Sequence, residues 1–150
     1  MPKAELIELQ KQHQTSQDKY TYFLLAITAS AIAFAIQKTD TLKITYSLIP
    51  LGFAVLIWGI SFYFGVKSIL YIQSSIHANY ALVQLKNYLY PEQPQSPELL
   101  KAAIEGVKSA FKYNANKVQF YSVWQFRLII LGGIFFLSWH ILEMIIRTIL

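Results

Sequence analysis

The sequence has no cysteine and few charged residues. Without cysteine the chain cannot form disulfides or thiolate metal sites and has no cysteine nucleophile. The lack of cysteine does not indicate whether the chain lies in an oxidising or a reducing compartment. Only 14% of the 150 residues are charged and 55% are apolar. This balance is too apolar for an ordinary soluble domain of that length. The composition therefore favours a one-domain membrane protein.

Motifs that carry catalysis are also missing. The sequence contains no glycine-rich phosphate loop, no nucleophile elbow, no His/Glu zinc motif and no carboxylate pair at a useful spacing. We therefore expect a protein that is not an enzyme and that carries no cofactor.

Three apolar runs predict three transmembrane helices, over residues 20–36, 47–67 and 127–147. Each is close to the roughly 20 residues that cross a bilayer. A polar helix over residues 1–19 precedes the first run, a loop over 37–46 follows it, and residues 148–150 follow the last. Ala33-Phe34-Ala35 fits a signal-peptide cleavage pattern, but three acidic residues precede that run and disfavour cleavage.

The middle of the chain, residues 68–126, predicts an antiparallel helical hairpin. Apolar residues at three- and four-residue spacing continue the second helix beyond the membrane, and a matching set follows three prolines in the turn at 90–97. Ser96 is the expected N-cap of one long helix that runs from Pro97 to the carboxyl end. The fold class is thus an all-α membrane protein. The first stripe is Ile69, Ile72, Ile76, Tyr80 and Val83, and the second is Leu100, Ala103, Ile104, Val107, Ala110, Phe111, Asn114 and Val118.

The basic residues predict the orientation. Ten of the 13 lysines and arginines, all but Lys38, Lys43 and Arg147, lie on the side of the amino terminus and the hairpin. Because an excess of Lys and Arg marks the cytoplasmic side, we expect a bacterial inner-membrane protein with a cytoplasmic N-terminus and an external C-terminus. Tyr46 and Trp139 would then mark the outer interface.

Small residues in the first two runs predict close helix packing. Helices approach closely in lipid where side chains are small. These residues either join the three spans of one chain or make contacts between subunits. We favour a homo-oligomer of roughly four to six copies. The small residues are Ala26, Ala29, Ser30 and Ala33 in the first run, and Gly52, Gly59, Ser61 and Gly65 in the second.

His140, Glu143 and Arg147 share one helical face near the outer end of the third span. They either form a small network, in which Arg147 snorkels and pairs with Glu143, or line a pore as a ring of Glu143 carboxylates that selects cations. In a ring, protonation of His140 would change the local charge. A metal site would need ligands from a symmetry mate.

A basic set lies in the predicted hairpin. Clustered cations beside aromatic rings are typical of phosphate and base binding, so a nucleotide or an oligonucleotide is a candidate ligand. The alternative is a merely solvated face, because Glu105 lies among the lysines. The set is Lys86, Lys101, Lys108, Lys112 and Lys117, flanked by Tyr88, Phe111 and Tyr113.

Residues 47–67, 86–117 and 128–147 together resemble the small membrane effectors of bacterial anti-phage systems, with the ion-channel effector type of the Hailong system as the nearest in architecture. The resemblance implies a homotetrameric channel that depolarises the membrane and is gated at its cytosolic hairpin by a nucleotide or nucleic-acid signal. The other hypothesis is a non-conducting accessory or scaffold subunit that docks a cytosolic partner protein through Tyr80, Val83 and Phe111.

Overall fold

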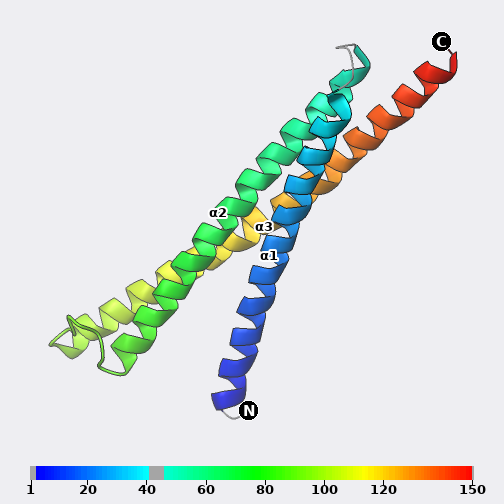
Figure 1. The fold of residues 1–150 in the computed structure, drawn as a ribbon. Helices are drawn as coiled ribbons and strands as arrows, with labels where there is room; N and C mark the ends of the chain where they lie inside the picture. Colours follow the sequence, from blue (N-terminus) through cyan, green and yellow to red (C-terminus); the bar gives the residue numbers. More distant parts are fainter. Residues whose placement is uncertain (1–2, 41–45, 150) are drawn as a thin grey trace. The chain divides into compact units, whose positions relative to one another are not determined.

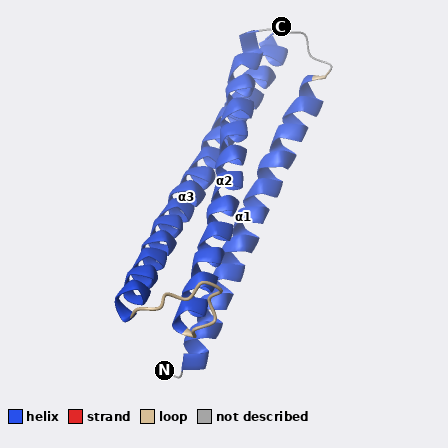
Figure 2. Ribbon diagram, turned by 90° about the vertical axis from the view of Figure 1, so that its left-hand side faces the viewer, coloured by secondary structure: helices blue, strands red, loops and turns tan. Residues whose placement is uncertain are grey.

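The computed structural model describes residues 3–40 and 46–149, and the side chains of all of these except 3–11, 13 and 14. It consists of three long helices and contains no strand in the described residues (Figures 1 and 2). Helix α1 spans Lys3–Thr39, α2 spans Ile49–Lys86 and α3 spans Pro97–Ile149, and a short 3-10 turn, η1, spans Tyr46–Leu48. The all-α prediction is confirmed.

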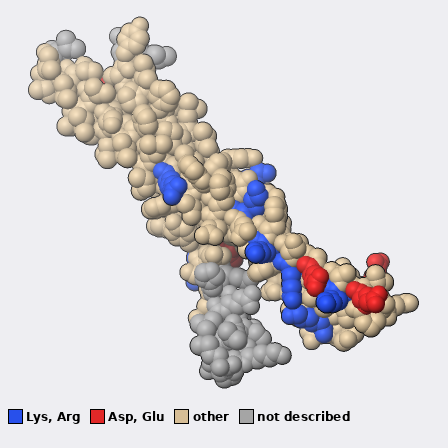
Figure 3. All heavy atoms as spheres, turned by 180° about the vertical axis from the view of Figure 1, so that it is seen from behind, with Lys and Arg blue, Asp and Glu red and all other residues tan. Residues whose placement is uncertain are grey.

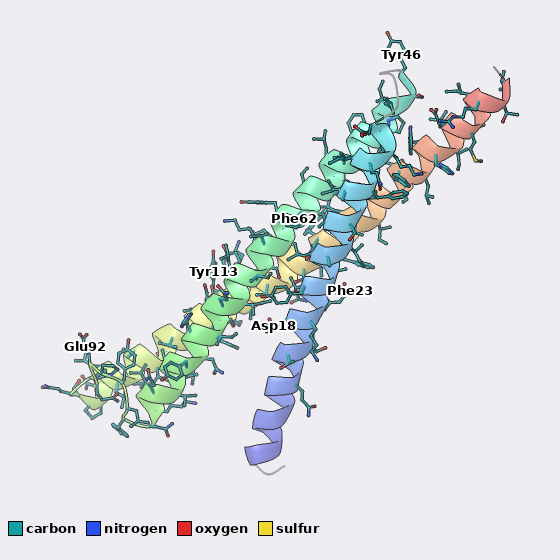
Figure 4. The ribbon with its side chains drawn as sticks, viewed as in Figure 1. Asp18, Phe23, Tyr46, Phe62, Glu92 and Tyr113 are labelled. Atoms are coloured by element: carbon teal, nitrogen blue, oxygen red, sulfur yellow. The ribbon has the colours of Figure 1, made fainter. Side chains whose placement is uncertain are left out.

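Each of the three helices is long and apolar enough to cross a membrane. The apolar stretches lie within Thr15–Thr39, Tyr46–Lys86 and Pro97–Ile149. Large apolar side chains are exposed along all three, among them Phe23 of α1 and Phe62 of α2 (Figure 4). Exposing large apolar side chains to water costs free energy, whereas exposing them to the hydrocarbon of a bilayer does not. The sequence prediction of three candidate spans is confirmed.

The helix ends differ from the predicted ones by a few residues. Helix α1 continues past residue 36 to Thr39, whose hydroxyl donates to the Ile36 carbonyl at 2.7 Å. Residues 41–45 of the predicted loop lie outside the described residues. Helix α2 ends at Lys86, and Tyr88 follows with a φ of 58°. The amide of Leu89 donates to the Gln84 carbonyl at 2.9 Å, which is the bond that closes a Schellman motif.

The start of α3 is the one that the sequence predicts. The Leu99 amide donates to the Ser96 hydroxyl at 3.2 Å, and the Leu100 amide donates to the Ser96 carbonyl at 3.0 Å. Ser96 is thus the N-cap, with Pro97 at the first helical position, where its missing N–H costs little. The single continuous helix predicted after Pro97 is confirmed as far as Ile149.

The described residues form two compact units. The span unit contains Met1–Val66 and Ser122–Leu150, and the middle unit contains Lys67–Tyr121.

The core of the span unit follows a seven-residue repeat on each helix. A repeat of seven is the spacing at which helices wind around one another with a left-handed twist. The repeat is built from small and medium side chains and two tryptophans, so the helices approach closely. The buried positions are Thr21, Leu24, Thr28 and Ala35 on α1, Leu51, Ala54, Trp58, Ser61 and Gly65 on α2, and Gln125, Gly132 and Trp139 on α3.

Two glycines allow the closest contacts in the span unit. A Cβ at Gly132 would overlap the indole ring of Trp58, and one at Gly65 would overlap the side chains of Gln125 and Leu25. The Trp58 indole N–H donates to the Ile129 carbonyl at 3.2 Å. Helices α2 and α3 are therefore fixed to each other by a glycine, a tryptophan and a hydrogen bond to the backbone.

The middle unit confirms one predicted stripe and only the start of the other, where Ile69 is half-buried and Ile72 is buried. On α3 the predicted positions are buried or half-buried, except Ala110, and Val118 is only 6% exposed. On α2, however, Ile76, Tyr80 and Val83 are 43%, 63% and 49% exposed, so the prediction that they face a partner helix of the same chain is wrong. The buried residues of this part of α2 are Ser68, Ile72, Ser75 and Leu85.

The physical reason for this correction is side-chain size. Small side chains let two helices come close, so the serines of α2 form its contact face and the bulky residues are displaced to the neighbouring face. The rings of Tyr71 and Tyr121 stack within this unit, with centroids 5.5 Å apart and planes 13° apart. The end of α2 is further tied to the turn, because the Gln93 amide donates to the Leu85 carbonyl at 3.1 Å.

Candidate functional site

A pocket of about 470 Å³ lies in the span unit between the ends of α1 and α3. We call it the terminal pocket. His140, Glu143 and Arg147, which the sequence places on one face, all line it. The structure therefore brings these three predicted residues together inside one chain. The complete lining is Phe34, Lys38, Phe136, Trp139, His140, Glu143, Met144 and Arg147.

Arg147 and Glu143 form the ion pair of this pocket. The Arg147 Nε lies 3.2 Å from the Glu143 Oε1, at the i, i+4 spacing that brings side chains on a helix together. The Glu143 side chain is 19% exposed and that of Arg147 is 67% exposed. The pairing predicted from the sequence is thus present.

Lys38 was not singled out by the sequence as a pocket residue, because it was placed in a loop. It lies instead in the last turn of α1, with its Nζ 5.5 Å from the centre of the Phe34 ring, a cation–π distance. The four-residue spacing of Phe34 and Lys38 was the available signal, and it requires that the helix continue beyond residue 36. The pocket therefore holds two cations, one from each helix.

Aromatic rings form the apolar wall of the terminal pocket. Phe136 lies 5.5 Å from Trp139 and 6.0 Å from Phe34, centre to centre. Trp139 is 5% exposed, and its indole N–H is buried with no hydrogen-bond partner in the described residues. Trp139 thus belongs to the core of the span unit.

Gln125 is a second unusual polar residue, one that the sequence analysis did not single out. Its side chain is fully buried, and neither its amide nitrogen nor its amide oxygen has a partner in the described part of the chain. Its backbone carbonyl accepts a hydrogen bond from the Ser61 hydroxyl at 2.8 Å. Thr21, Thr28 and Ser61 are also buried, so the span unit holds several polar side chains in an otherwise apolar core.

The basic residues predicted to bind a ligand lie in the middle unit and are only partly grouped. Lys101 and Lys108 line a pocket of about 410 Å³ together with Tyr88 and Glu105. Lys112 is exposed on the same face of α3, one turn further on. Basic and acidic side chains lie side by side on this unit on the face drawn in Figure 3.

The other two lysines are separate from this pocket. Lys117 comes nine residues after Lys108, which places it on the opposite side of the helix. It is half-buried, with its Nζ 5.5 Å from the centre of the Tyr113 ring. Lys86 is exposed in the last turn of α2. Three of the five predicted lysines thus share one face of α3.

Among the side chains that the structure describes, no three His, Asp or Glu residues gather as a metal site would require. No family model matches the chain, and neither does any curated protein or solved structure.

Proposed function

We propose that the chain is the subunit of a homo-oligomeric ion channel in a membrane. The observation that carries this proposal is a set of small residues in the spans that takes no part in packing within the chain. Ala26, Ala29, Ser30 and Ala33 are exposed on α1, and a Cβ at Gly52 or Gly59 would meet nothing within 4 Å. Small residues on lipid-facing helices are the usual contact between membrane helices.

An ion path in this proposal runs between copies rather than through one chain. The three helices of the span unit pack too closely for a passage, since Gly65 and Gly132 already lie against neighbouring side chains. A symmetry axis would place several copies of α3 around one opening. We assign Glu143 to the outer mouth of this ion path, because its side chain is partly exposed beside Arg147.

We place the middle unit in the cytoplasm as an antiparallel hairpin, and the carboxyl end outside. The excess of basic residues on the side of the hairpin supports this orientation. The Tyr71–Tyr121 stack and the Gln93–Leu85 hydrogen bond support the hairpin. The lysine pocket with Lys101 and Lys108 is then the candidate site for an anionic nucleotide or oligonucleotide that gates the channel, as the resemblance to anti-phage effectors implies.

Single-channel recording tests the proposal. Purified protein in planar bilayers should pass current in discrete steps, and Glu143→Gln should lower the preference for cations, because a carboxylate at the mouth concentrates them. Glu105→Gln, which removes an exposed carboxylate from the middle unit, is the matched control and should leave selectivity unchanged. The absence of current, with and without an oligonucleotide on the side of the hairpin, would contradict the proposal.

The second candidate function is a non-conducting accessory subunit that docks a cytosolic protein. The exposed stripe of Ile76, Tyr80 and Val83 favours it, because apolar side chains in water normally cover a partner surface. Phe111, the third residue expected to dock, is half-buried. A stoichiometric soluble partner that is lost on Tyr80→Glu, with no current from the purified protein, would support this function over the channel.

A further inference from the structure

The terminal pocket combines positive charge with an apolar wall. Lys38 and Arg147 stand against one carboxylate, Glu143, so the pocket has a net positive charge when His140 is neutral. Phe34, Phe136 and Met144 supply apolar surface beside these cations. A ligand that fits has an anionic group at one end and hydrocarbon at the other.

The position of both cations matches the edge of a bilayer. Lys38 lies in the last turn of α1 and Arg147 in the last turn of α3, each directly after an apolar stretch. Lipid phosphates occupy this level, where Lys and Arg side chains at helix ends reach the headgroups. Lys and Arg side chains that only reach toward the headgroups do not need to line a cavity. Lys38 and Arg147, however, line the same cavity.

The pocket retains enough N–H hydrogen-bond donors to bind a phosphate. The Glu143 carboxylate engages the Arg147 Nε, and a guanidinium carries five N–H donors in all, so further donors are left for a second anion. The Lys38 ammonium adds three donors on the α1 side.

We propose that the terminal pocket binds the phosphate headgroup of an anionic phospholipid, with Lys38 and Arg147 on the phosphate and Phe34, Phe136 and Met144 along the glycerol and upper acyl chain. Glu143 lines both this pocket and the proposed outer mouth, but lipid binding does not require ion conduction. A channel without bound lipid, or a lipid-binding protein without current, would therefore separate the two proposals.

Native mass spectrometry of the full chain tests this site. Delipidated protein in detergent is titrated with phosphatidylglycerol, with zwitterionic phosphatidylcholine and with inorganic phosphate. We expect phosphatidylglycerol to be retained preferentially, and Lys38→Gln combined with Arg147→Gln to weaken its binding by about tenfold or more. Lys101→Gln with Lys108→Gln removes the same charge from the middle unit and should leave this binding unchanged.

Two further measurements distinguish the loss of the binding site from misfolding of a variant. Lys38→Arg keeps the charge and should retain the lipid even if the neutral double variant folds poorly, and circular dichroism shows whether each variant remains helical. Equal retention of the two lipids, or unchanged binding in the double variant when helicity is intact, would overturn the proposal. Full displacement of the lipid by millimolar inorganic phosphate would assign the pocket to a free anion and overturn it as well.

Discussion

Gly132 and Trp58 show how single residues determine the packing of the spans. The indole ring of Trp58 occupies the space that a side chain at position 132 would need, and its N–H reaches the Ile129 carbonyl. The adjacent Gly133 has nothing within 4 Å of an added Cβ. Two neighbouring glycines in one helix therefore have different roles, and only their three-dimensional surroundings distinguish them.

Gly132→Ala should destabilise the span unit by about 1–3 kcal/mol, because a methyl group in a filled space forces the indole or the helix to move. Gly133→Ala is the matched control and should be neutral or stabilising by up to about 1 kcal/mol, since alanine favours the helix. Thermal unfolding of both variants in the same detergent measures the difference. Equal stability of the two variants would mean that Trp58 does not pack on Gly132.

Removal of the Gln125 amide, unlike addition of a methyl group at Gly132, should raise the stability of the protein. This amide is buried without a partner in the described residues, and such a group costs about 1–3 kcal/mol. Gln125→Met keeps the unbranched shape and removes the polar atoms, so it should raise the stability of the protein by about that amount. Gln125→Ala, which leaves a cavity, should lower it. If Gln125→Met instead destabilises the protein, then the amide has a partner in the assembled protein.

At the scale of the helices, the ends of α2 and α3 show which sequence signals were sufficient. Ser96, Pro97 and the prolines before them predicted the start of α3, and the hydrogen bonds from Leu99 and Leu100 to Ser96 confirm it. Capping depends on residues within one turn, so the sequence contains the whole signal. The end of α2 carried no such signal, because Tyr88 occupies a left-handed position where glycine is usual.

Ser96→Ala should destabilise the first turn of α3 by about 1 kcal/mol, because the Leu99 amide loses its acceptor. Hydrogen exchange at Leu99 should then be about fivefold faster. Ser74→Ala is the matched control, since the Ser74 hydroxyl bonds to the Leu70 carbonyl within α2, where the backbone is already paired. Unchanged exchange at Leu99 would show that Ser96 is not the cap.

The faces of the helices were predictable only where bulk and burial coincide. On α3 of the middle unit the bulky apolar residues are also the buried ones, so periodicity identified the correct face. On α2 the buried face includes Ser68 and Ser75, and hydropathy does not indicate that a serine is buried. The terminal pocket itself was not predicted, because it forms between two helices. Spacing along α3 grouped His140, Glu143 and Arg147, whereas Lys38 comes from another helix.

At the scale of the whole molecule, composition was the strongest predictor. Three apolar stretches in 150 residues predict three spans, and the structure contains three helices long and apolar enough to cross a membrane. Subunit number and conduction depend on contacts between copies, which one chain does not specify. The exposed small residues of α1 and α2 supply the surface on which those contacts are proposed.

Site-specific labelling tests the central claim, that the chain crosses the membrane three times, so that the span of α2 separates its start from the middle unit. Because the chain has no cysteine, single substitutions give clean labels. Tyr46 is 92% exposed and Lys108 is exposed, so both positions are accessible. In intact cells a membrane-impermeant maleimide should label Tyr46→Cys, and it should label Lys108→Cys only after permeabilisation. Labelling of both positions from outside, or a water-soluble monomer in the absence of detergent, would contradict the account.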